Sequence, residues 1–335
     1  MINTTTQVAP AVNVFYNRVL LKRAIPFLAH AMFGQQKPLP TKSGQKPKFR
    51  KYNSMTPATR PLQEGVRPSG QSLSTTEVEG QIYTYGDFIS ITDDVDLTVE
   101  DATLTEVAVL LGEWSGESLD EVYRDVLNAG TSVRYAGGVA GRDSIVTKVT
   151  TADLRVIKRT LRRRNVKFWR NTPVYGSNRV DSKTIPACYY CITHTMVIND
   201  LEQLDEWVPV DRYADGGASA IEGEVGAIPK VNMRFIESTK AKCFAGEGGD
   251  PAGATMAYDI GEDSSHADIY TILIFGQDAY GITPLSGHAL RNIIHSFGHG
   301  DDPLEQECTS GWKAKTGCLI LDDLNMYRLE CGVSA

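Results

Sequence analysis

Two cysteines in the sequence have the type and spacing that could bind a metal ion. Cys188 and Cys191 enclose two tyrosines in a C-x2-C arrangement. A structural zinc site is tetrahedral and takes a second ligand pair at similarly short spacing, whereas Cys308 and Cys318 are separated by nine residues. We therefore interpret the C-x2-C pair as buried thiols of a strand, and the sequence predicts no metal site.

A second candidate is a pair of histidines, His295 and His299, that follow His288. Two imidazoles four residues apart on a helix share one face and could hold a metal ion. Gly298 and Gly300 interrupt any such helix, so a loop or surface role is favoured. A metal-binding enzyme that uses these histidines and the C-x2-C pair is the rival hypothesis, and metal analysis of the purified protein would separate the two.

Other patterns that could carry chemistry have simpler explanations. The segment GEGGDPAG, residues 246–253, lacks the strand-to-helix setting and the Lys-Ser/Thr pair of a phosphate-binding loop, so we interpret it as a flexible turn. Asp93, Asp94 and Asp96 could bind a cation, but they also precede a predicted helix and stabilise the positive end of its dipole. No G-x-S-x-G elbow is present. The sequence predicts neither a catalytic residue nor a cofactor.

The amino-acid composition excludes several classes of protein. The 335 residues are 41% hydrophobic and 22% charged, which is typical of a globular chain with room for one large or two medium cores. A net charge of -7 argues against a sequence-specific nucleic-acid binder. Six cysteines make no dense disulfide framework, and no signal peptide or apolar run of membrane-spanning length occurs, so we expect free thiols and no membrane partner.

The elements that position these residues begin with an amphipathic helix within residues 12–31 and an exposed, extended arm over 35–48. Strands are predicted at 48–52 and 81–92, separated by the polar, Pro- and Gly-rich segment 56–80. If both strands continue into that segment as a hairpin, each arm of ~15 residues reaches roughly 50 Å. A chain of this length has a radius of gyration of only about 20 Å, so the hairpin would leave its own core and need a neighbouring surface.

A long helix is predicted at about 101–129, where an apolar stripe follows the helical period. Gly112 and Gly116 lie inside it, and close packing of another backbone would explain them. A basic helix starts at Thr151. After this helix the predicted secondary structure mixes strands and helices. Strands are expected at 187–193, 230–238 and 268–276, a short helix at 200–207, and a final pair of strands near the end.

The order of several segments resembles the major capsid proteins of tailed bacteriophages over residues 12–331. The first are FYNRVLLKRAIPFLAHAMFGQQKPLPTKSGQKPKFRKYNSMTPATRPLQEGV, YGDFISITDDVDL and LTEVAVLLGEWSGESLDEVYRDVLNAGTSVRYAGG. The later ones are GEVGAIPKVNMRFIES, IYTILIFGQDAYGI and DPLEQECTSGWKAKTGCLILDDLNMYRLE.

The resemblance implies the α+β capsid fold of tailed phages and herpesviruses. It implies an arm at 1–47, an extended β-hairpin loop at 48–92, a peripheral domain at 93–145 and 286–335 with a spine helix at about 101–129, and an axial domain at 146–285. The last strands would return to the peripheral sheet. Some relatives crosslink a loop lysine to a neighbour, but residues 52–85 contain no lysine, so a non-covalent shell is expected.

The function implied is that of a shell protein, without catalytic activity, that forms hexamers and pentamers of an icosahedral virion around double-stranded DNA. Implied partners are a portal, a separate scaffolding protein and a cement or decoration protein, with assembly in the host cytoplasm. An encapsulin-type compartment shell is the alternative on the same fold. The expected intersubunit contacts are Arg60, Leu62, Glu64, Val66, Arg67, Leu73, Glu77 and Glu79. The DNA-facing candidates are Arg159, Arg162, Arg163 and Arg164, although a solvated helix face is the favoured explanation of this basic cluster.

Overall fold

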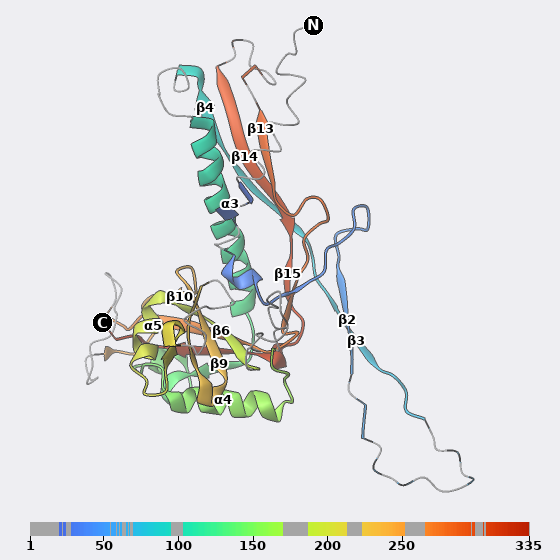
Figure 1. Ribbon diagram of the computed structural model, residues 1–335, viewed down its shortest axis with the longest axis vertical. Coiled ribbons are helices and arrows are strands. Elements are labelled where there is room, and N and C mark those ends of the chain that lie inside the picture. Colours follow the sequence, from blue (N-terminus) through green and yellow to red (C-terminus); the bar gives the residue numbers. More distant parts are fainter. Residues whose placement is uncertain are drawn as a thin grey trace, which may run out of the picture.

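In the computed structural model the chain forms a base around a large sheet, a long spine that rises from the base, and a hairpin that projects sideways (Figure 1). The structure describes residues 20, 21, 23, 24, 28–53, 55–57, 59, 61, 65, 67, 70–94, 103–169, 187–212, 223–251, 265–295, 297, 298, 304 and 306–334. Most of the predicted first helix, including Pro26, lies outside these residues.

The base is built on an eight-stranded mixed sheet. Its order is β5 (Val133–Tyr135), β16 (Met326–Cys331), β11 (Ile269–Phe275), β6 (Tyr189–His194), β9 (Met233–Ser238), β8 (Glu224–Ile228) and β7 (Val208–Pro209), with β10 (Cys243–Phe244) paired to β11. Strand β6 is parallel to β9 and antiparallel to β11. The strands predicted at 187–193, 230–238 and 268–276 are confirmed within three residues at each end.

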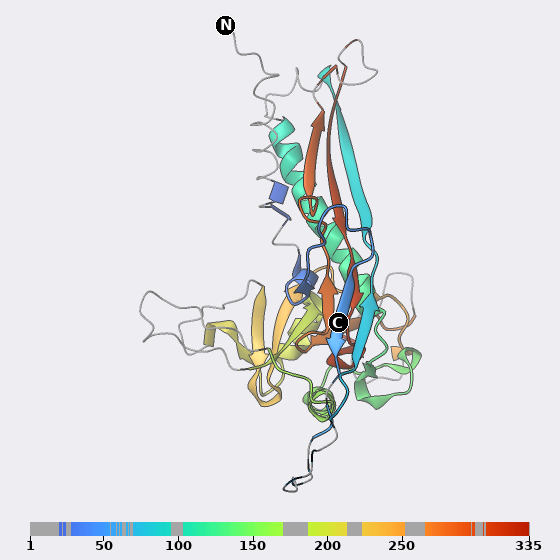
Figure 2. The same cartoon turned by 90° about the vertical axis from the view of Figure 1, so that its right-hand side faces the viewer.

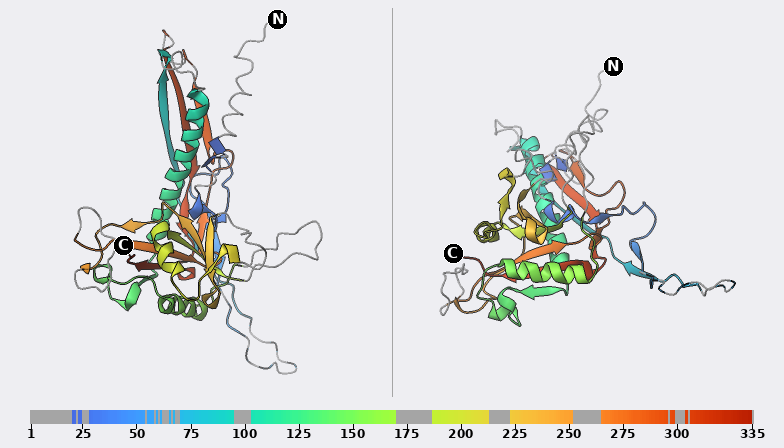
Figure 3. Two further views of the ribbon diagram at one scale, coloured as in Figure 1. Left: turned by 60° about the vertical axis from the view of Figure 1, so that its left-hand side comes forward. Right: turned by 60° about the horizontal axis from the view of Figure 1, so that its bottom comes forward.

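The two central strands are buried on both faces, because a separate hydrophobic core lies on each side of the sheet. In β6, Tyr189 and Cys191 point into one core and Tyr190 and Ile192 into the other, as the twofold alternation of a strand requires. Helices α4 (Thr151–Arg163) and α5 (Thr195–Glu202) cover the first core, and Figure 3 shows α4 lying along the sheet. The short helix expected at 200–207 begins and ends about five residues earlier.

The spine combines the longest helix with three strands. Helix α3 (Thr103–Asn128) packs along the sheet β13 (Arg291–His295), β14 (Glu307–Thr316) and β4 (Tyr83–Thr92), whose strands rise beside the helix in Figure 2. The predicted helix limits of 101–129 are therefore accurate. A Cβ atom added at Gly112 would lie 2.8 Å from the Leu20 carbonyl oxygen, so the backbone of the chain's first described helical residues packs directly on this glycine, as expected.

The arm does not run free over residues 35–48. Strand β1 (Gln35–Gln36) pairs parallel with β12 (Tyr280–Ile282), which pairs with β15 (Cys318–Ile320). The Leu39 N–H donates to the Pro284 carbonyl oxygen at 2.9 Å. The backbone of the first part of the arm is thus bound to its own subunit, while the side chains of residues 35–40 are exposed as predicted, apart from the half-buried Leu39.

Two pairings differ from the sequence-based expectation. The hairpin strand β2 (Lys48–Tyr52) pairs with β3 (Thr75–Glu79), whereas residues 83–92 pair with β14 in the spine. The final strand β16 enters the sheet of the base between β5 and β11 and does not return to the sheet of the spine. The remaining turns of 3-10 helix are η2 (Ala29–Ala31), η3 (Ala136–Gly138), η4 (Arg142–Ser144), η5 (Val210–Arg212), η6 (Pro229–Val231) and η8 (Asp323–Asn325).

Candidate functional site

Two ion pairs join the antiparallel strands of the hairpin. Across the two strands, Lys48 Nζ lies 2.5 Å from Glu79 Oε1 and Arg50 Nη2 lies 2.6 Å from Glu77 Oε1. Each hydrogen-bonded partner stabilises the charged form of the other, which raises the pKa of Lys48 and lowers that of Glu79. All four side chains are exposed, so solvent screens these pairs and they contribute little to folding.

The root of the hairpin is fixed to the body of the protein. Phe49 is buried against Gly281, where a Cβ atom would lie 2.8 Å from the Phe49 ring. Lys37 Nζ lies 5.3 Å from the centre of that ring, and Lys51 forms an ion pair with Asp322. The direction in which the hairpin leaves the subunit is therefore set by packing at its first strand.

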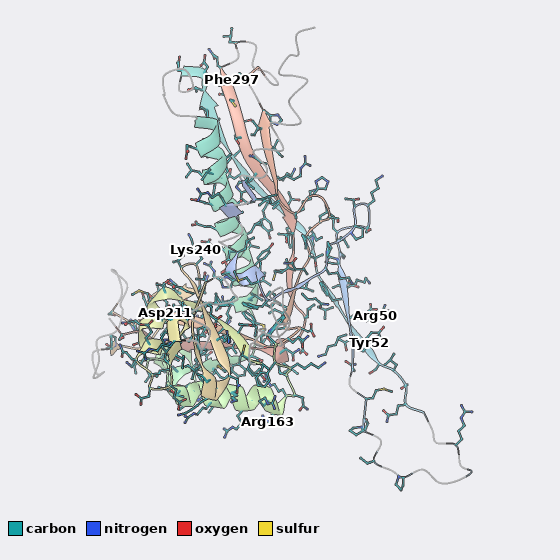
Figure 4. The ribbon with its side chains drawn as sticks, viewed as in Figure 1. Arg50, Tyr52, Arg163, Asp211, Lys240 and Phe297 are labelled. Atoms are coloured by element: carbon teal, nitrogen blue, oxygen red, sulfur yellow. The ribbon has the colours of Figure 1, made fainter. Side chains whose placement is uncertain are left out.

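Beyond the root, none of the described residues of the hairpin has a buried hydrophobic side chain. Its two strands form a separate two-stranded sheet, and a ribbon of this kind is marginal in water without further packing. The exposed fractions of Tyr52 and Leu73 are 61% and 63%, and Figure 4 shows Tyr52 on the projecting part of the chain. Further out, Gln71 Nε2 donates to the Thr56 carbonyl oxygen at 2.8 Å. The hairpin presents polar and apolar groups that its own subunit leaves uncovered.

The expected contact residues fall into two groups. Glu77 and Glu79 lie in β3 and pair within the hairpin, while Arg67 and Leu73 are exposed in the segment that joins its two strands. The structure does not describe the others, which are Arg60, Leu62, Glu64 and Val66. Contact of this set with a second subunit stays a prediction.

The basic cluster on α4 is only partly available to a partner. The Arg162 guanidinium lies 4.8 Å from the centre of the Phe168 ring, and Arg164 Nη1 donates to Ser132 Oγ at 3.2 Å. Arg159 and Arg163 are exposed one helical turn apart, with no ion pair to another described residue. Figure 4 shows Arg163 at the edge of the base, directed away from it.

The cysteines and histidines do not come together. Cys188 and Cys191 are buried, and burial raises the pKa of Cys188 to about 11 and that of Cys191 well above its ordinary value. His295 ends strand β13, so it does not lie on a helix, and His299 is outside the described residues. Within the described part of the chain no group of three or more His, Cys, Asp or Glu side chains could hold a metal ion.

The glycine-rich segment is not a flexible turn in its described part. The Gly248 N–H donates to the Ala267 carbonyl oxygen and the Gly249 N–H to the Ile145 carbonyl oxygen, both at 2.9 Å. A Cβ atom at Gly248 would lie 2.5 Å from that Ala267 oxygen, so the glycine allows two backbones to meet. Residues 252 and 253 lie outside the described chain.

Sequence analysis missed two buried polar clusters. His30 N–H and Nδ1 both lie 2.7 Å from the Asp120 carboxylate, and the Tyr280 hydroxyl donates to the His30 carbonyl oxygen at 2.7 Å. In the base, Glu330 is fully buried and accepts two hydrogen bonds from Arg142. Their members are 90 or more residues apart in the chain, so no local motif signals them.

Three ion pairs join the base to the acidic side of helix α3 in the spine. Lys240, in the turn after β9, lies 3.0 Å from Glu117 and 3.6 Å from Glu121, and Lys242 lies 3.2 Å from Asp125. The three acids are spaced by four residues and share one helix face. Figure 4 shows Lys240 where the base meets the helix.

Comparison with known proteins shows the fold. No protein-family model and no curated protein sequence matches the chain. The capsid structure of Ralstonia phage GP4 is 13% identical with a TM-score of 0.67, over 90% of this chain and 88% of that one. The cyanophage Pam1 capsid is 11% identical with a TM-score of 0.61, over 95% and 93%. The head structure of Helicobacter pylori bacteriophage KHP40 is 14% identical with a TM-score of 0.61, over 89% and 87%.

These similarities confirm the predicted fold class, because they extend over almost the whole of each chain. The α+β fold of this chain is that of tailed-phage major capsid proteins. Among the described helices none is both long and apolar enough to span a bilayer.

Proposed function

We propose that this chain, which has the tailed-phage capsid fold, is a major capsid protein whose copies assemble into an icosahedral virion shell. The observation that carries the proposal is the hairpin, which projects from a firmly anchored root and whose described residues beyond that root bury no hydrophobic side chain. Fixing its backbone costs about 1 to 2 kcal/mol per residue, and only a surface outside the subunit can offset that cost.

Several finer features belong to the same proposal. The copies form hexamers and pentamers around double-stranded DNA, with the base as axial domain and the spine as peripheral domain. A portal and a separate scaffolding protein take part in assembly in the host cytoplasm, and a decoration protein can be added. The role is structural and not catalytic, and the absence of lysine from residues 52–85 favours a shell without loop crosslinks.

Assembly of the expressed protein tests this function. Sedimentation and electron microscopy, with and without a co-expressed scaffolding protein, should show capsomers and closed shells. A protein that stays monomeric under both conditions would refute the proposal.

We predict that Arg67→Glu impairs assembly much more than folding. Arg67 is exposed and forms no ion pair with another described residue, so its loss should change the stability of the isolated subunit little, while a weak contact repeated around a shell adds up. We expect the protein concentration needed for assembly to rise about tenfold. The control is Lys167→Glu, an exposed residue of the base with the same change of charge. Equal losses in melting temperature and assembly would contradict the prediction.

We propose that Arg159 and Arg163 contact packaged DNA without sequence preference. Each phosphate contact releases counterions, so Arg159→Gln with Arg163→Gln should reduce the slope of log affinity against log salt by about 2. Binding of linear duplex DNA at several salt concentrations measures this, with Lys42→Gln and Lys46→Gln on the arm as the matched pair. An unchanged slope would remove this cluster from the DNA-facing surface.

A further inference from the structure

A small three-stranded sheet lies between the arm and the hairpin. Its strand order is β1, β12 and β15, and we call this sheet the platform. The arm supplies β1, whose residues Gln35 and Gln36 pair parallel with Gly281 and Ile282 of β12. Figure 1 shows the arm, in blue, running from beside α3 towards the hairpin. The arm therefore forms one edge of the platform, and β15 forms the other.

The root of the hairpin packs on the platform. A Cβ atom at Gly281 in β12 would lie 2.8 Å from the Phe49 ring, and one at Gly80 would lie 3.0 Å from the Leu319 side chain in β15. The exposed fraction of Phe49 is only 5%, whereas the other residues of β2 are exposed. Because a glycine at each point lets the hairpin approach closely, the position of the root depends on the positions of β12 and β15.

The arm also contacts the root directly through Lys37, the residue that follows β1. Lys37 Nζ donates to the Lys48 carbonyl oxygen at 2.8 Å and lies 5.3 Å from the centre of the Phe49 ring. The negative face of an aromatic ring attracts an ammonium group at this distance. The Lys37 N–H donates to the Ile282 carbonyl oxygen at 3.0 Å. One residue thus binds β12 with its backbone and the hairpin with its side chain.

Contacts on the other side of β12 hold the arm in place. A Cβ atom at Gly34 would lie 2.7 Å from the Tyr280 ring, so the arm lies directly against β12. Phe33 stacks on Tyr190 with ring centres 4.5 Å apart. The Tyr280 hydroxyl accepts from the Phe33 N–H and donates to the His30 carbonyl oxygen. Tyr280 therefore contacts the arm, while the next residue of the same strand contacts the hairpin.

The other contacts at the root do not replace those of the arm. Lys51 pairs with Asp322, but the Lys51 side chain is more than half exposed, and exposed pairs of this kind are weak. The Gly80 and Ile82 N–H groups donate to carbonyl oxygens of residues 47 and 45, which follow the arm in the chain. The root is therefore fixed mainly by the platform, of which the arm is a part.

We propose that the docked arm, residues 29–39, fixes the hairpin root, and that Lys37 is its positioning residue. While β1 lies on β12, the platform is complete and the hairpin leaves the subunit in one direction. When the arm is displaced, the root loosens and the hairpin no longer reaches a neighbouring copy in a fixed orientation. This inference rests on the proposed assembly function, and it makes displacement of the arm a means of stopping assembly.

Lys37→Ala tests the positioning role. It removes the ammonium group from the Phe49 ring, so amide exchange in the root, residues 48–52 and 79–82, should become about fivefold faster. The protein concentration needed for assembly should rise by about the same factor, with a melting temperature equal to that of the control. The matched control is Lys42→Ala, in the exposed loop between arm and root.

Lys37→Arg should restore both values, because a guanidinium also lies over aromatic rings and donates hydrogen bonds. An effect of Lys37→Ala no larger than that of Lys42→Ala would overturn the role of Lys37. A loss that Lys37→Arg does not restore would overturn it as well.

Gly34→Val tests whether the arm acts on the root through the platform. The new side chain would collide with the Tyr280 ring and with Ile282, so residues 35–39 should leave β12 and exchange their amide hydrogens at least about tenfold faster. The root should follow with a similar increase. Gly70→Ala is the control, since nothing lies within 4 Å of a Cβ atom there. A loosened arm with an unchanged root would overturn the proposal. If Gly34→Val does not fold, the Lys37 variants decide.

Exchange and assembly measured on the same variants separate this inference from the shell function. If arm and root loosen together in a protein that never forms capsomers or shells, the coupling is supported and the shell function is refuted. If a variant with a loosened root assembles at the wild-type concentration, the role of the arm in assembly is refuted and the shell function stands.

Discussion

Replacing Glu330 by Gln is expected to lower the free energy of unfolding by about 3 kcal/mol. Glu330 is fully buried in the base, where Arg142 Nε and Nη2 donate to its two oxygens at 2.7 and 3.0 Å. Arg328 Nε lies 2.8 Å from one of these oxygens but is not aligned for a hydrogen bond. Removing the negative charge leaves the guanidinium groups of Arg142 and Arg328 beside a neutral buried side chain, with the more exposed Glu247 as the remaining carboxylate partner of Arg142.

The expected loss of stability depends on the charge and position of Arg142. Its hydrogen bonds to Glu330, and more weakly to Glu247, raise the pKa of Arg142. After the substitution the arginine still stays charged, because a guanidinium is not deprotonated in proteins. Glu330 lies in β16 and Arg142 in η4, so the pair joins the sheet to the loop beside it. Chemical denaturation monitored by circular dichroism measures the change.

Glu247→Gln is the matched control, because Glu247 pairs with the same Arg142 but is more than half exposed. The control should lose less than about 1 kcal/mol. Equal losses in the two variants would show that burial of Glu330 does not set the strength of the interaction.

Asp120→Ala is expected to lower the free energy of unfolding by about 3 kcal/mol, because two buried donors of His30 lose their acceptor. The effect should concentrate in the arm. His30 lies in η2 and Asp120 in α3, and the Tyr280 hydroxyl, which donates to His30, also accepts from the Phe33 N–H at 3.2 Å. With the carboxylate gone, residues 29–39 should exchange their amide hydrogens much faster than β6 or β11.

Glu113→Ala on the same helix is the control. Glu113 is partly exposed and lies 3.8 Å from Arg23, so its loss should leave exchange in the arm almost unchanged. If Asp120→Ala raises exchange equally in the arm and the central strands, the cluster supports the whole fold and not the arm in particular.

The sequence predicted elements well where local periodicity determines them. Helix α3 was placed within two residues, since its apolar stripe follows the helical period over 26 residues. Close packing at Gly112 was predicted correctly for the same reason: a glycine inside a strong helix costs stability unless another backbone needs the space.

The pairing partner of each strand could not be predicted from local periodicity, because pairing depends on tertiary packing. The sequence TTEVE of β3 is polar and mostly exposed, so its alternation gave no signal, and the apolar residues 83–92 were assigned to the hairpin instead. The one available clue was charge, since Lys48 and Arg50 face Glu79 and Glu77. Clusters such as His30 with Asp120 join segments that are distant in the sequence, so no local sequence motif predicts them.

The position of β16 also bears on when the protein can fold during synthesis. This strand follows every other strand of the large sheet in the chain, yet it lies between β5 and β11 and not at an edge. The sheet therefore cannot close until residue 331 has left the ribosome, and until then the edges of β5 and β11 remain open. A chain terminated before β16 would lack this strand and could not complete the sheet of the base.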